Sequence, residues 1–340
     1  MMEKINWGIL GCGKIAHSFA EALTATEGNV AYAAAARDGA RAKAFAGQWG
    51  FRKSYGSYVE LAGDPEVDIV YIATPHSYHF AHTKLCLESG KHVLCEKPFT
   101  INAAQMQILK DLAAKQNLFL MEALWTRFLP DMIETGNILR RGDIGDPVIM
   151  EADFGIRFPY HPEHRLFNPH LGGGALLDLG IYPLFLSLYL FGEPQILKAH
   201  SLLDKNRIDL VTTMISETDS GVQCQMNTTV LANTPVRARI TGSEGSLDLH
   251  SWWFQPTDIT LKTSGSTEEV LRFPPHVNGY EYEIMESAKC LRENKKESTI
   301  MSLDFSLLLM DQLDRVRRET GISYPPQIES TREPYGWKEL

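Results

Sequence analysis

The sequence has no excess of basic residues and no long apolar run, and each absence excludes a class of protein. The chain carries 33 Lys and Arg residues against 42 Asp and Glu residues, which gives a formal charge of −9. Nucleic acids and anionic membranes attract basic surfaces, so we expect neither as the main partner. No run of about 18 apolar residues occurs, which argues against a membrane-spanning helix.

Cysteine is scarce, and proline and serine form no tract. The five cysteines are odd in number and widely spaced, with no C-x-x-C pair. This pattern fits reduced thiols better than a disulfide framework, so we expect a cytoplasmic protein. The first predicted strand begins by Ile5, which leads us to expect no signal peptide. The remaining composition, 44% hydrophobic and 22% charged over 340 residues, predicts a globular chain of about two domains.

A glycine-rich loop is the first stretch that indicates a function. A predicted strand over residues 5–10 is followed by Gly11-Cys12-Gly13-Lys14-Ile15-Ala16, and a helical pattern continues from there. This is the G-x-G-x-x-G/A fingerprint of dinucleotide-binding proteins in its strand–turn–helix context. Gly11 permits the tight turn and Gly13 lets the backbone approach a pyrophosphate, while the helix N-terminus supplies partial positive charge. We therefore predict a dinucleotide site that includes Lys14 and Ile15.

The second predicted strand, about residues 30–36, ends at Arg37-Asp38. A site that prefers NAD usually carries an acid here for the ribose 2′-hydroxyl, whereas an arginine suits the 2′-phosphate of NADP. Asp38 leaves two alternatives open, an NAD-type acid shifted by one residue or a cap for the helix predicted over residues 40–49. We favour NADP over NAD, with Arg37 as the phosphate ligand.

Strands and helices continue to alternate as far as residue 124, which predicts a Rossmann-type, doubly wound parallel sheet. Thr74, Pro75 and His76 end one strand on the same side as the glycine loop, so we expect them near the cofactor. The further strands are predicted over residues 68–73, 92–95 and 118–121, and the further helices over residues 57–62, 78–87 and 102–115.

An acid, a base and a proline follow the predicted strand over residues 92–95. Pro98 cannot continue a central strand, and it biases Lys97 towards extended backbone. An amine is thereby fixed at the carboxyl end of a strand, where open α/β sheets bind their ligands. The alternative is a surface turn in which Glu96 and Lys97 form a solvated ion pair.

Beyond residue 124 the pattern changes to β-type alternation with short turns that contain Gly and Asp, which indicates an open, mostly antiparallel sheet. We predict a dinucleotide-binding domain over residues 1–124 and an α+β domain for substrate binding and oligomerisation over residues 125–340. An open sheet with an apolar outer face would be covered by a second subunit, so we expect a homodimer or a higher homo-oligomer. The predicted strands are 148–156, 196–203, 210–217, 222–230, 236–241, 246–249, 258–262 and 269–272, and the predicted helices are 131–140, 280–293 and 303–319.

Three glycines at residues 172–174 precede a helix that carries Asp178 and Tyr182, four residues apart. A free tyrosine has a pKa of about 10, and a nearby Lys97 cation would lower that pKa enough for proton transfer with a substrate hydroxyl. Asp178 could hydrogen-bond the substrate or hold the lysine. The alternative is a core helix with Tyr182 at its rim.

Two groups of histidines have spacings that suggest a metal, but we predict none. On a helix His76 and His82 point about 240° apart, so with His79 they cannot converge on one ion. Three more histidines lie between residues 161 and 170, in a loop without the required acids, and this loop could instead touch the substrate.

Together these motifs resemble the Gfo/Idh/MocA oxidoreductase family over essentially the whole chain. The resemblance is strongest to the branch of dimeric dihydrodiol dehydrogenases and NADP-dependent xylose dehydrogenases. The segments that carry it are residues 11–16, 36–38, 74–79, 94–98, 119–128 and 172–182.

The resemblance implies roles for individual residues. Lys97 would lie next to the nicotinamide and the substrate, with Asp178 as its partner. Tyr182 stands where many members have a histidine, which makes it the acid/base. Glu96 and the segment from Thr74 through His79 would surround the cofactor. The resemblance also implies a cis peptide between residues 97 and 98, with Trp125 and Arg127 at the nicotinamide end.

The sequence thus predicts an NADP-dependent oxidoreductase that transfers hydride between the nicotinamide and a CH–OH carbon of a sugar, cyclic polyol or trans-dihydrodiol. One alternative is a reductase of another carbonyl or imine substrate on the same scaffold. The other is a dinucleotide-sensing protein without turnover.

Overall fold

The computed structural model describes residues 4–332, and contacts divide them into two compact units. The first unit comprises residues 4–125, 276–307 and 326–332, and the second comprises residues 126–275 and 308–325. Residues 276–307, which the sequence patterns grouped with the second domain, thus belong by their contacts to the first unit. The predicted domain boundary at residue 124 stays a prediction.

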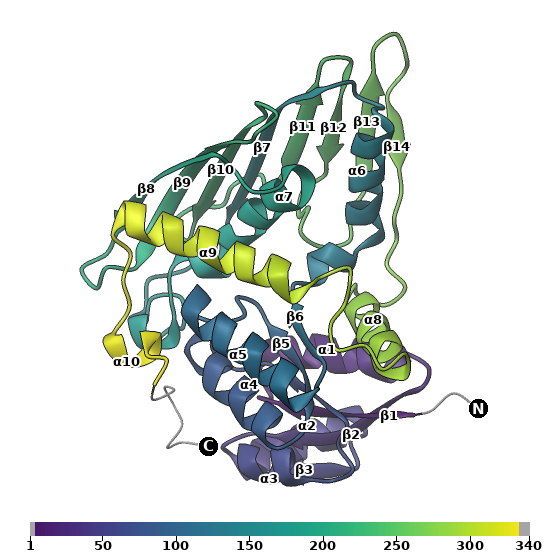
Figure 1. Cartoon of the computed structure of the whole chain (residues 1–340), viewed down its shortest axis with the longest axis vertical. Helices are drawn as coiled ribbons and strands as arrows, with labels where there is room; N and C mark the ends of the chain where they lie inside the picture. Colours follow the sequence, from purple (N-terminus) through teal and green to yellow (C-terminus); the bar gives the residue numbers. More distant parts are fainter. Residues whose placement is uncertain (1–3, 333–340) are drawn as a thin grey trace. The chain divides into compact units, whose positions relative to one another are not determined.

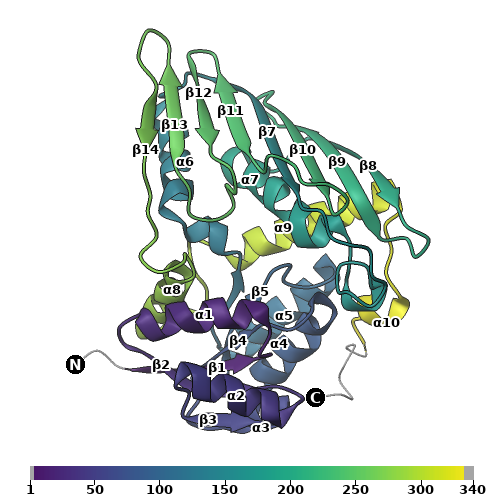
Figure 2. The same ribbon diagram turned by 180° about the vertical axis from the view of Figure 1, so that it is seen from behind.

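The first unit is built on a parallel sheet with the strand order β3-β2-β1-β4-β5-β6, which confirms the predicted doubly wound fold. Helices α1 and α2 cover one face, with α8 beside α1, and α4 and α5 cover the other (Figures 1 and 2). The strands are β1 (Ile5–Leu10), β2 (Asn29–Ala35), β3 (Lys53–Tyr55), β4 (Ile69–Ile72), β5 (His92–Glu96) and β6 (Leu120–Ala123). The helices are α1 (Lys14–Ala25), α2 (Gly39–Trp49), α3 (Tyr58–Gly63), α4 (His79–Glu88), α5 (Ala103–Gln116), α8 (Glu281–Arg292) and α10 (Pro326–Glu329).

Because helices cover both faces of this sheet, its strands are continuous apolar runs and do not alternate between apolar and polar residues. All four residues of β4 are completely buried. On one side of the sheet Tyr71 stacks on Phe19 of α1, with ring centroids 3.6 Å apart. This packing fixes the carboxyl ends of β1, β4 and β5, where the predicted cofactor residues lie.

The second unit contains a sheet with the strand order β14-β13-β12-β11-β7-β10-β9-β8. Neighbouring strands run antiparallel except β7 and β10, which are parallel, so the predicted mostly antiparallel sheet is confirmed. The strands are β7 (Pro147–Gly155), β8 (Ile196–Leu203), β9 (Asp209–Glu217), β10 (Gln223–Thr229), β11 (Ala238–Gly242), β12 (Gly245–Leu249), β13 (Ile259–Thr263) and β14 (Glu269–Leu271). Helices α6 (Pro130–Arg141), α7 (Ile181–Phe191) and the later part of α9 (Leu303–Thr320) lie along one face of this sheet (Figure 1).

The other face of this sheet is turned toward the viewer in Figure 2, with the helices of the unit behind it. Exposed apolar side chains such as Ile215 alternate there with polar ones, and Gln225 pairs in register with both Ile215 and Glu151. Glu151 in turn lies opposite Arg239. The outer face is therefore mixed rather than uniformly apolar, because period-two alternation marks which residues face outward but not how polar a whole cross-strand row is.

One helical stretch, Pro169–Phe191, is long and apolar enough to cross a membrane by length and composition. Of its most apolar window, 83% is buried inside the protein. Such burial is typical of a core helix, and this helix positions Asp178 and Tyr182.

A buried acid in the first unit should make stability depend on pH. Glu122 on β6 accepts a hydrogen bond from the Phe99 N–H at 3.0 Å, and burial raises its pKa from 4.5 to about 7. Because the pKa of Glu122 is higher in the folded than in the unfolded protein, protonation of Glu122 stabilises the fold. This stabilisation is complete below the unfolded pKa and is lost as the pH rises through about 7. We expect Glu122→Gln, which keeps an acceptor for Phe99, to stabilise the protein by up to about 3 kcal/mol near pH 9 but little near pH 5.

Melting temperatures of the wild type and Glu122→Gln across this pH range measure the effect. The exposed Glu66 supplies the matched control, and Glu66→Gln should change the melting temperature at neither pH. A difference between Glu122→Gln and wild type that is the same at both pH values would show that Glu122 does not titrate as burial requires.

Candidate active site

The glycine loop has the backbone that a pyrophosphate requires. Gly11 has φ +100°, and a Cβ there would lie 2.9 Å from the Ala73 carbonyl oxygen, so only glycine fits. Gly13 is the extended N-cap of α1, and as a glycine it has no side chain to cap that N-terminus. Lys14, exposed, and Ile15, half-buried, form the first turn. The backbone amides at this helix end therefore fit an anionic ligand.

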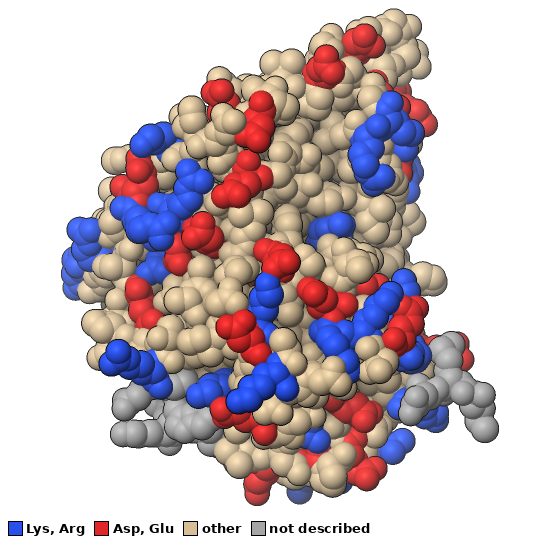
Figure 3. Space-filling view, in the orientation of Figure 1, with Lys and Arg blue, Asp and Glu red and all other residues tan. Residues whose placement is uncertain are grey.

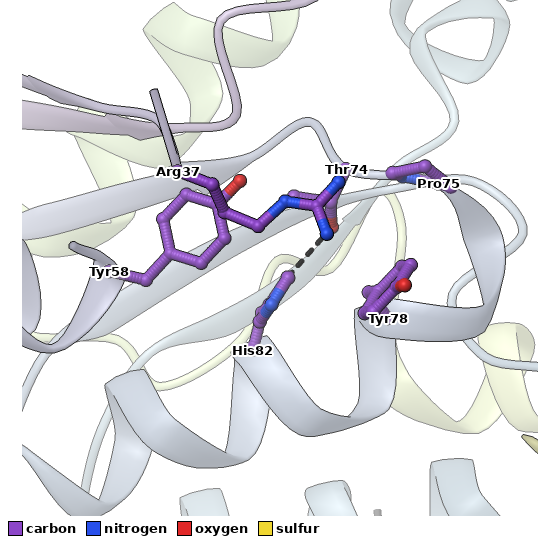
Figure 4. A pocket seen from close by; sticks show the side chains of 6 residues that line it. All are labelled: Arg37, Tyr58, Thr74, Pro75, Tyr78 and His82. Atoms are coloured by element: carbon purple, nitrogen blue, oxygen red, sulfur yellow. Dashed lines mark hydrogen bonds between the residues drawn. The ribbon is translucent and has the colours of Figure 1, made fainter. Parts of the chain in front are cut away.

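A pocket beside this loop is lined by Arg37, Tyr58, Thr74, Pro75, Tyr78 and His82 (Figure 4). Arg37 reaches over the pocket, with its guanidinium carbon 5.9 Å from the centroid of the Tyr78 ring. The His82 ring stacks on Tyr78 and its Nδ1 lies 2.9 Å from the Thr74 hydroxyl. Burial lowers the pKa of His82 to about 3, so this imidazole is neutral. Flat rings and an exposed arginine fit an adenosine that carries a phosphate.

Asp38 belongs to the helix rather than to this pocket. Its Oδ1 accepts a hydrogen bond from the Ala40 N–H at 2.9 Å and a longer one from the Arg41 N–H, so it caps α2. The geometry thus favours the helix-cap alternative for Asp38 over that of an NAD-type acid.

Arg41 is a second cation at this end of the sheet that sequence patterns did not identify. Its Nε donates a hydrogen bond to the Cys12 carbonyl at 2.9 Å, which ties the guanidinium to the glycine loop. Arg41 lies in the first turn of α2, where an exposed charged residue usually serves only solubility, so no local pattern singled it out.

His76 and His79 lie where β4 ends. Both are buried, with ring centroids 5.8 Å apart. The two ring nitrogens of His79 each lie 2.8 Å from a carbonyl oxygen, one from Thr74 and one from Pro98. Burial, with the charges of His76 and Lys97, lowers the pKa of His79 to about 3, so the neutral ring donates to only one of these oxygens. His79 therefore holds the chain segments that follow β4 and β5 together.

The segment around Lys97 follows β5 directly. Glu96, the last residue of β5, accepts hydrogen bonds from the Tyr71 hydroxyl and, at 3.2 Å, from the Lys97 N–H. The peptide between Lys97 and Pro98 is cis, which confirms that expectation. Lys97 is half-buried and follows β5 directly, so the residue lies at the carboxyl end of the sheet and is not fully exposed.

Trp125 and Arg127, predicted at the nicotinamide end, belong to different units. Trp125 is in the first unit, where its ring stacks on Tyr280 at 4.5 Å. Arg127 is in the second unit, where its guanidinium carbon lies 4.1 Å from the centroid of the Tyr189 ring. Burial lowers the pKa of Arg127, and the aromatic face compensates part of the lost hydration.

Asp178 and Tyr182 lie in the second unit, on a π-helical turn (Leu176–Gly180) and the first turn of α7. Tyr182 is 5% exposed, and its ring packs against Phe254 at 4.9 Å and Phe154 at 5.5 Å. Asp178 makes a two-pronged ion pair with Arg165, with distances of 2.9 and 3.0 Å. Lys97 lies in the first unit, so its meeting with these two residues stays a prediction.

Asp209 on β9 supports this helical segment and was not identified from the sequence. Its Oδ2 accepts hydrogen bonds from the Leu176 N–H at 2.8 Å and the Thr212 hydroxyl at 2.7 Å. Burial raises the pKa of Asp209 from 3.8 to about 6. A strand acid that caps a helix more than thirty positions earlier leaves no local pattern, which is why sequence reasoning missed it.

Gly174 is the glycine of this segment whose replacement should have the largest effect. It has φ +112°, and a Cβ there would lie 2.4 Å from Asp209 Oδ1. We expect Gly174→Ala to destabilise the protein by about 3 kcal/mol, from backbone strain and displacement of the buried carboxylate, and to lower kcat at least about tenfold. Thermal unfolding and steady-state kinetics measure both effects.

Gly221 is the matched control, because it has φ +81° but nothing within 4 Å of its added Cβ. Gly221→Ala should cost only about 1 kcal/mol and leave kcat unchanged. Equal effects of the two substitutions would mean that the contact with Asp209 contributes nothing to the destabilisation caused by Gly174→Ala.

Comparison with known proteins places the chain among oxidoreductases. Residues 5–124 match the model described as an oxidoreductase family with an NAD-binding Rossmann fold, and residues 133–248 match the GFO/IDH/MocA C-terminal domain. The chain is 36% identical to a trans-1,2-dihydrobenzene-1,2-diol dehydrogenase of Xenopus tropicalis, and 34% identical to the human enzyme of that name. These alignments cover 94% of this chain and 99% and 98% of the two relatives, respectively.

Solved structures give the same result for the fold. A 3-ketoreductase from Actinomadura kijaniata, in complex with NADP and TDP-benzene, superposes with a TM-score of 0.84 at 26% identity, over 94% of this chain and 98% of the other. An aldose-aldose oxidoreductase from Caulobacter crescentus gives a TM-score of 0.84 at 24% identity, with the same coverage of both chains.

Proposed function

Because the chain belongs to the Gfo/Idh/MocA oxidoreductase family and is an NAD(P)-dependent dehydrogenase of CH–OH groups, we propose that it uses NADP to oxidise a trans-dihydrodiol, a sugar or a cyclic polyol. The observation that carries this proposal is the identity of about one third, along nearly the whole chain, to dihydrodiol dehydrogenases. The tyrosine at position 182, where many members of the family have a histidine, supports it.

The preference for NADP is supported by the pocket in Figure 4. Arg37 extends from the end of β2 into the pocket, while Asp38 is engaged as a helix cap and does not compete for a ribose hydroxyl. Arg41 adds a second positive charge beside the glycine loop. Two guanidinium groups bind a 2′-phosphate strongly because each can donate two parallel hydrogen bonds.

Arg37→Ala tests this preference. We expect the KM for NADP to rise about 30-fold, because one charge-assisted contact to the 2′-phosphate is lost. The KM for NAD should change little. Arg52, which is exposed and lies over Tyr32 in the same unit, is the control, and Arg52→Ala should alter neither value. A parallel rise of both KM values in Arg37→Ala would contradict a role in recognising the 2′-phosphate.

In the proposed mechanism, bound nicotinamide supplies the hydride acceptor or donor. Tyr182 takes the proton of the substrate hydroxyl during oxidation and returns it during reduction. The Lys97 cation stabilises the phenolate form of Tyr182, which accepts the proton in oxidation and is formed again when the proton is returned in reduction, and Asp178 accepts a hydrogen bond from a substrate hydroxyl. The low exposure of Tyr182 and Asp178 keeps water away from the proton that moves.

Aromatic rings beside Tyr182 support a substrate with an apolar ring face. Phe154 stacks on Phe254 at 4.1 Å, and Trp252 meets Phe254 at 5.9 Å. Trp252 is 42% exposed, so this aromatic group reaches the surface of the second unit. The C–H faces of cyclic diols and pyranoses pack well on such rings.

A panel of trans-dihydrodiols, aldoses and cyclic polyols with NADP or NAD tests the function. We expect oxidation of at least one class, with NADP preferred. Turnover only with carbonyl or imine substrates and NADPH would favour the reductase alternative. Tight NADPH binding with no turnover in either direction would overturn the proposal in favour of a dinucleotide-sensing protein.

We also propose a cytoplasmic homodimer that forms through the open face of the eight-stranded sheet. The exposed Ile215 and Ile196 lie on this face, with Gln225 and Arg239 available for hydrogen bonds and ion pairs across an interface. Light scattering should give the mass of two chains, and the mass of one chain would refute the dimer.

Acidic and basic side chains are interspersed on the face seen in Figure 3, which supports a small-molecule substrate over nucleic acid as the main partner.

A further inference from the structure

We propose that Arg165 is a positioning residue that fixes the carboxylate of Asp178 for the reaction and joins the loop at residues 156–171 to the catalytic segment. This inference rests on the place of Asp178 in the proposed active site. Nothing in the sequence motifs points to Arg165, which stands among the histidines and aromatic residues of that loop.

The contact between the two side chains has the geometry of a strong ion pair. Nη1 of Arg165 donates to Oδ1 of Asp178 at 2.9 Å, and Nη2 donates to Oδ2 at 3.0 Å. Two parallel bonds between a planar guanidinium and a planar carboxylate fix orientation as well as distance. The carboxylate can therefore neither rotate nor move without breaking one of them.

The two partners differ greatly in exposure. The Asp178 side chain is 6% exposed, whereas that of Arg165 is 47% exposed. A carboxylate so far removed from water needs a compensating cation nearby, and Arg165 supplies one from the solvent side. Each carboxylate oxygen has two acceptor lone pairs, so one bond from Arg165 does not exhaust its capacity to accept hydrogen bonds, including one from a substrate hydroxyl.

The backbone around Arg165 is itself anchored to the glycine segment. The Gly174 N–H donates to the Leu166 carbonyl at 2.9 Å, and a Cβ at Gly173 would lie 2.8 Å from the Arg165 carbonyl oxygen. Leu166 and Phe167 are buried immediately after the arginine. The glycines before the catalytic turn therefore also let the loop approach closely enough for Arg165 to reach Asp178.

The pair also makes the electrostatics of this part of the site suited to a neutral substrate. The charges of Arg165 and Asp178 offset each other, so the pair itself adds no net charge to the surface that a hydroxyl-bearing substrate would meet. Without Arg165 the Asp178 carboxylate would lose this cation and the orientation that the two parallel bonds impose. The structure thus assigns to Arg165 a role in holding Asp178 ready for neutral diols or sugars.

The test combines kinetics with hydrogen exchange on the full chain. We expect Arg165→Gln to lower kcat about 30-fold with a smaller change in KM, and Arg165→Lys to recover part of the loss because it restores the charge but not the two-pronged geometry. In an Asp178→Asn background, Arg165→Gln should add less than about threefold, because both changes remove the same interaction. Arg157→Gln, an exposed arginine of the same loop, should leave kcat and KM unchanged.

Hydrogen exchange separates this inference from the proposed function, because it needs no substrate. The amides of residues 156–171 should exchange at least about tenfold faster in Arg165→Gln than in wild type or Arg157→Gln, while the melting temperature shows that the protein is folded. Unchanged exchange would overturn the anchoring of the loop. Faster exchange with kcat within about twofold of wild type, or losses that multiply in the double variant, would overturn the positioning role.

Discussion

Lys97→Met is expected to lower kcat by about a thousandfold while NADPH binds nearly as before. Methionine has a similar length and fills similar space, but it has no charge to stabilise a phenolate, and acid–base assistance of this kind contributes roughly 10²–10⁴-fold. The cofactor should remain bound because the groups that we propose for its phosphates, the glycine loop and Arg37, lie on other segments. Steady-state rates and a fluorescence titration with NADPH measure the two effects.

Lys84→Met provides the control for this experiment. Lys84 lies on α4 of the same unit and forms an ion pair with Glu88 near the surface, so its replacement should leave both kcat and NADPH affinity unchanged. Near-normal turnover in Lys97→Met would refute the assignment of the lysine. An equal loss of cofactor affinity would show that Lys97 serves binding rather than proton transfer.

Tyr182→Phe should lower kcat by about 10²–10³-fold with little change in stability. Phenylalanine retains the ring contacts with Phe154 and Phe254 and removes only the hydroxyl that carries the proton. The loss should depend on Lys97: the double variant is expected to be little slower than the slower single one, because residues that act as a unit are not additive. Kinetics of the two single variants and the double variant measure this coupling.

Tyr189→Phe on the same helix is the matched control. Tyr189 stacks on Phe185 and its hydroxyl reaches the Met132 carbonyl only at 3.5 Å, so this change should leave kcat unaffected. Independent, multiplying losses in the variants of Lys97 and Tyr182 would contradict a shared proton transfer. Such a result would also count against the meeting of the two residues, which belong to different units.

Local sequence patterns predicted the elements of the fold well where hydrophobic period and turn chemistry agree. The strand at residues 5–10, the glycine turn and α1 follow from short-range signals that the structure confirms. β3, three residues long, was too short to produce a recognisable period and was missed. The grouping of residues 276–307 with the first unit depends on contacts far apart in the chain, which no local pattern records.

The candidate site residues also fall into two groups, those that local sequence patterns indicate and those that depend on contacts between distant segments. Motifs singled out Lys97, Asp178 and Tyr182 as candidates because their neighbours have distinctive turn and helix patterns, and their shared catalytic role stays a prediction. The partners that hold the catalytic segment in place were not found, because Arg165 lies in an irregular loop and Asp209 on a distant strand. For Asp38 the sequence allowed two roles, and the hydrogen bond from Ala40 supports the structural one.

Following the transferred hydrogen tests the proposed chemistry most directly. Incubate the protein with NADP and a trans-dihydrodiol that carries deuterium at the carbon to be oxidised, and analyse the reduced nicotinamide by mass spectrometry. Hydride transfer from the CH–OH carbon predicts one deuterium in each molecule of NADPH formed. NADPH without deuterium, formed while that diol is consumed, would contradict the dehydrogenase mechanism.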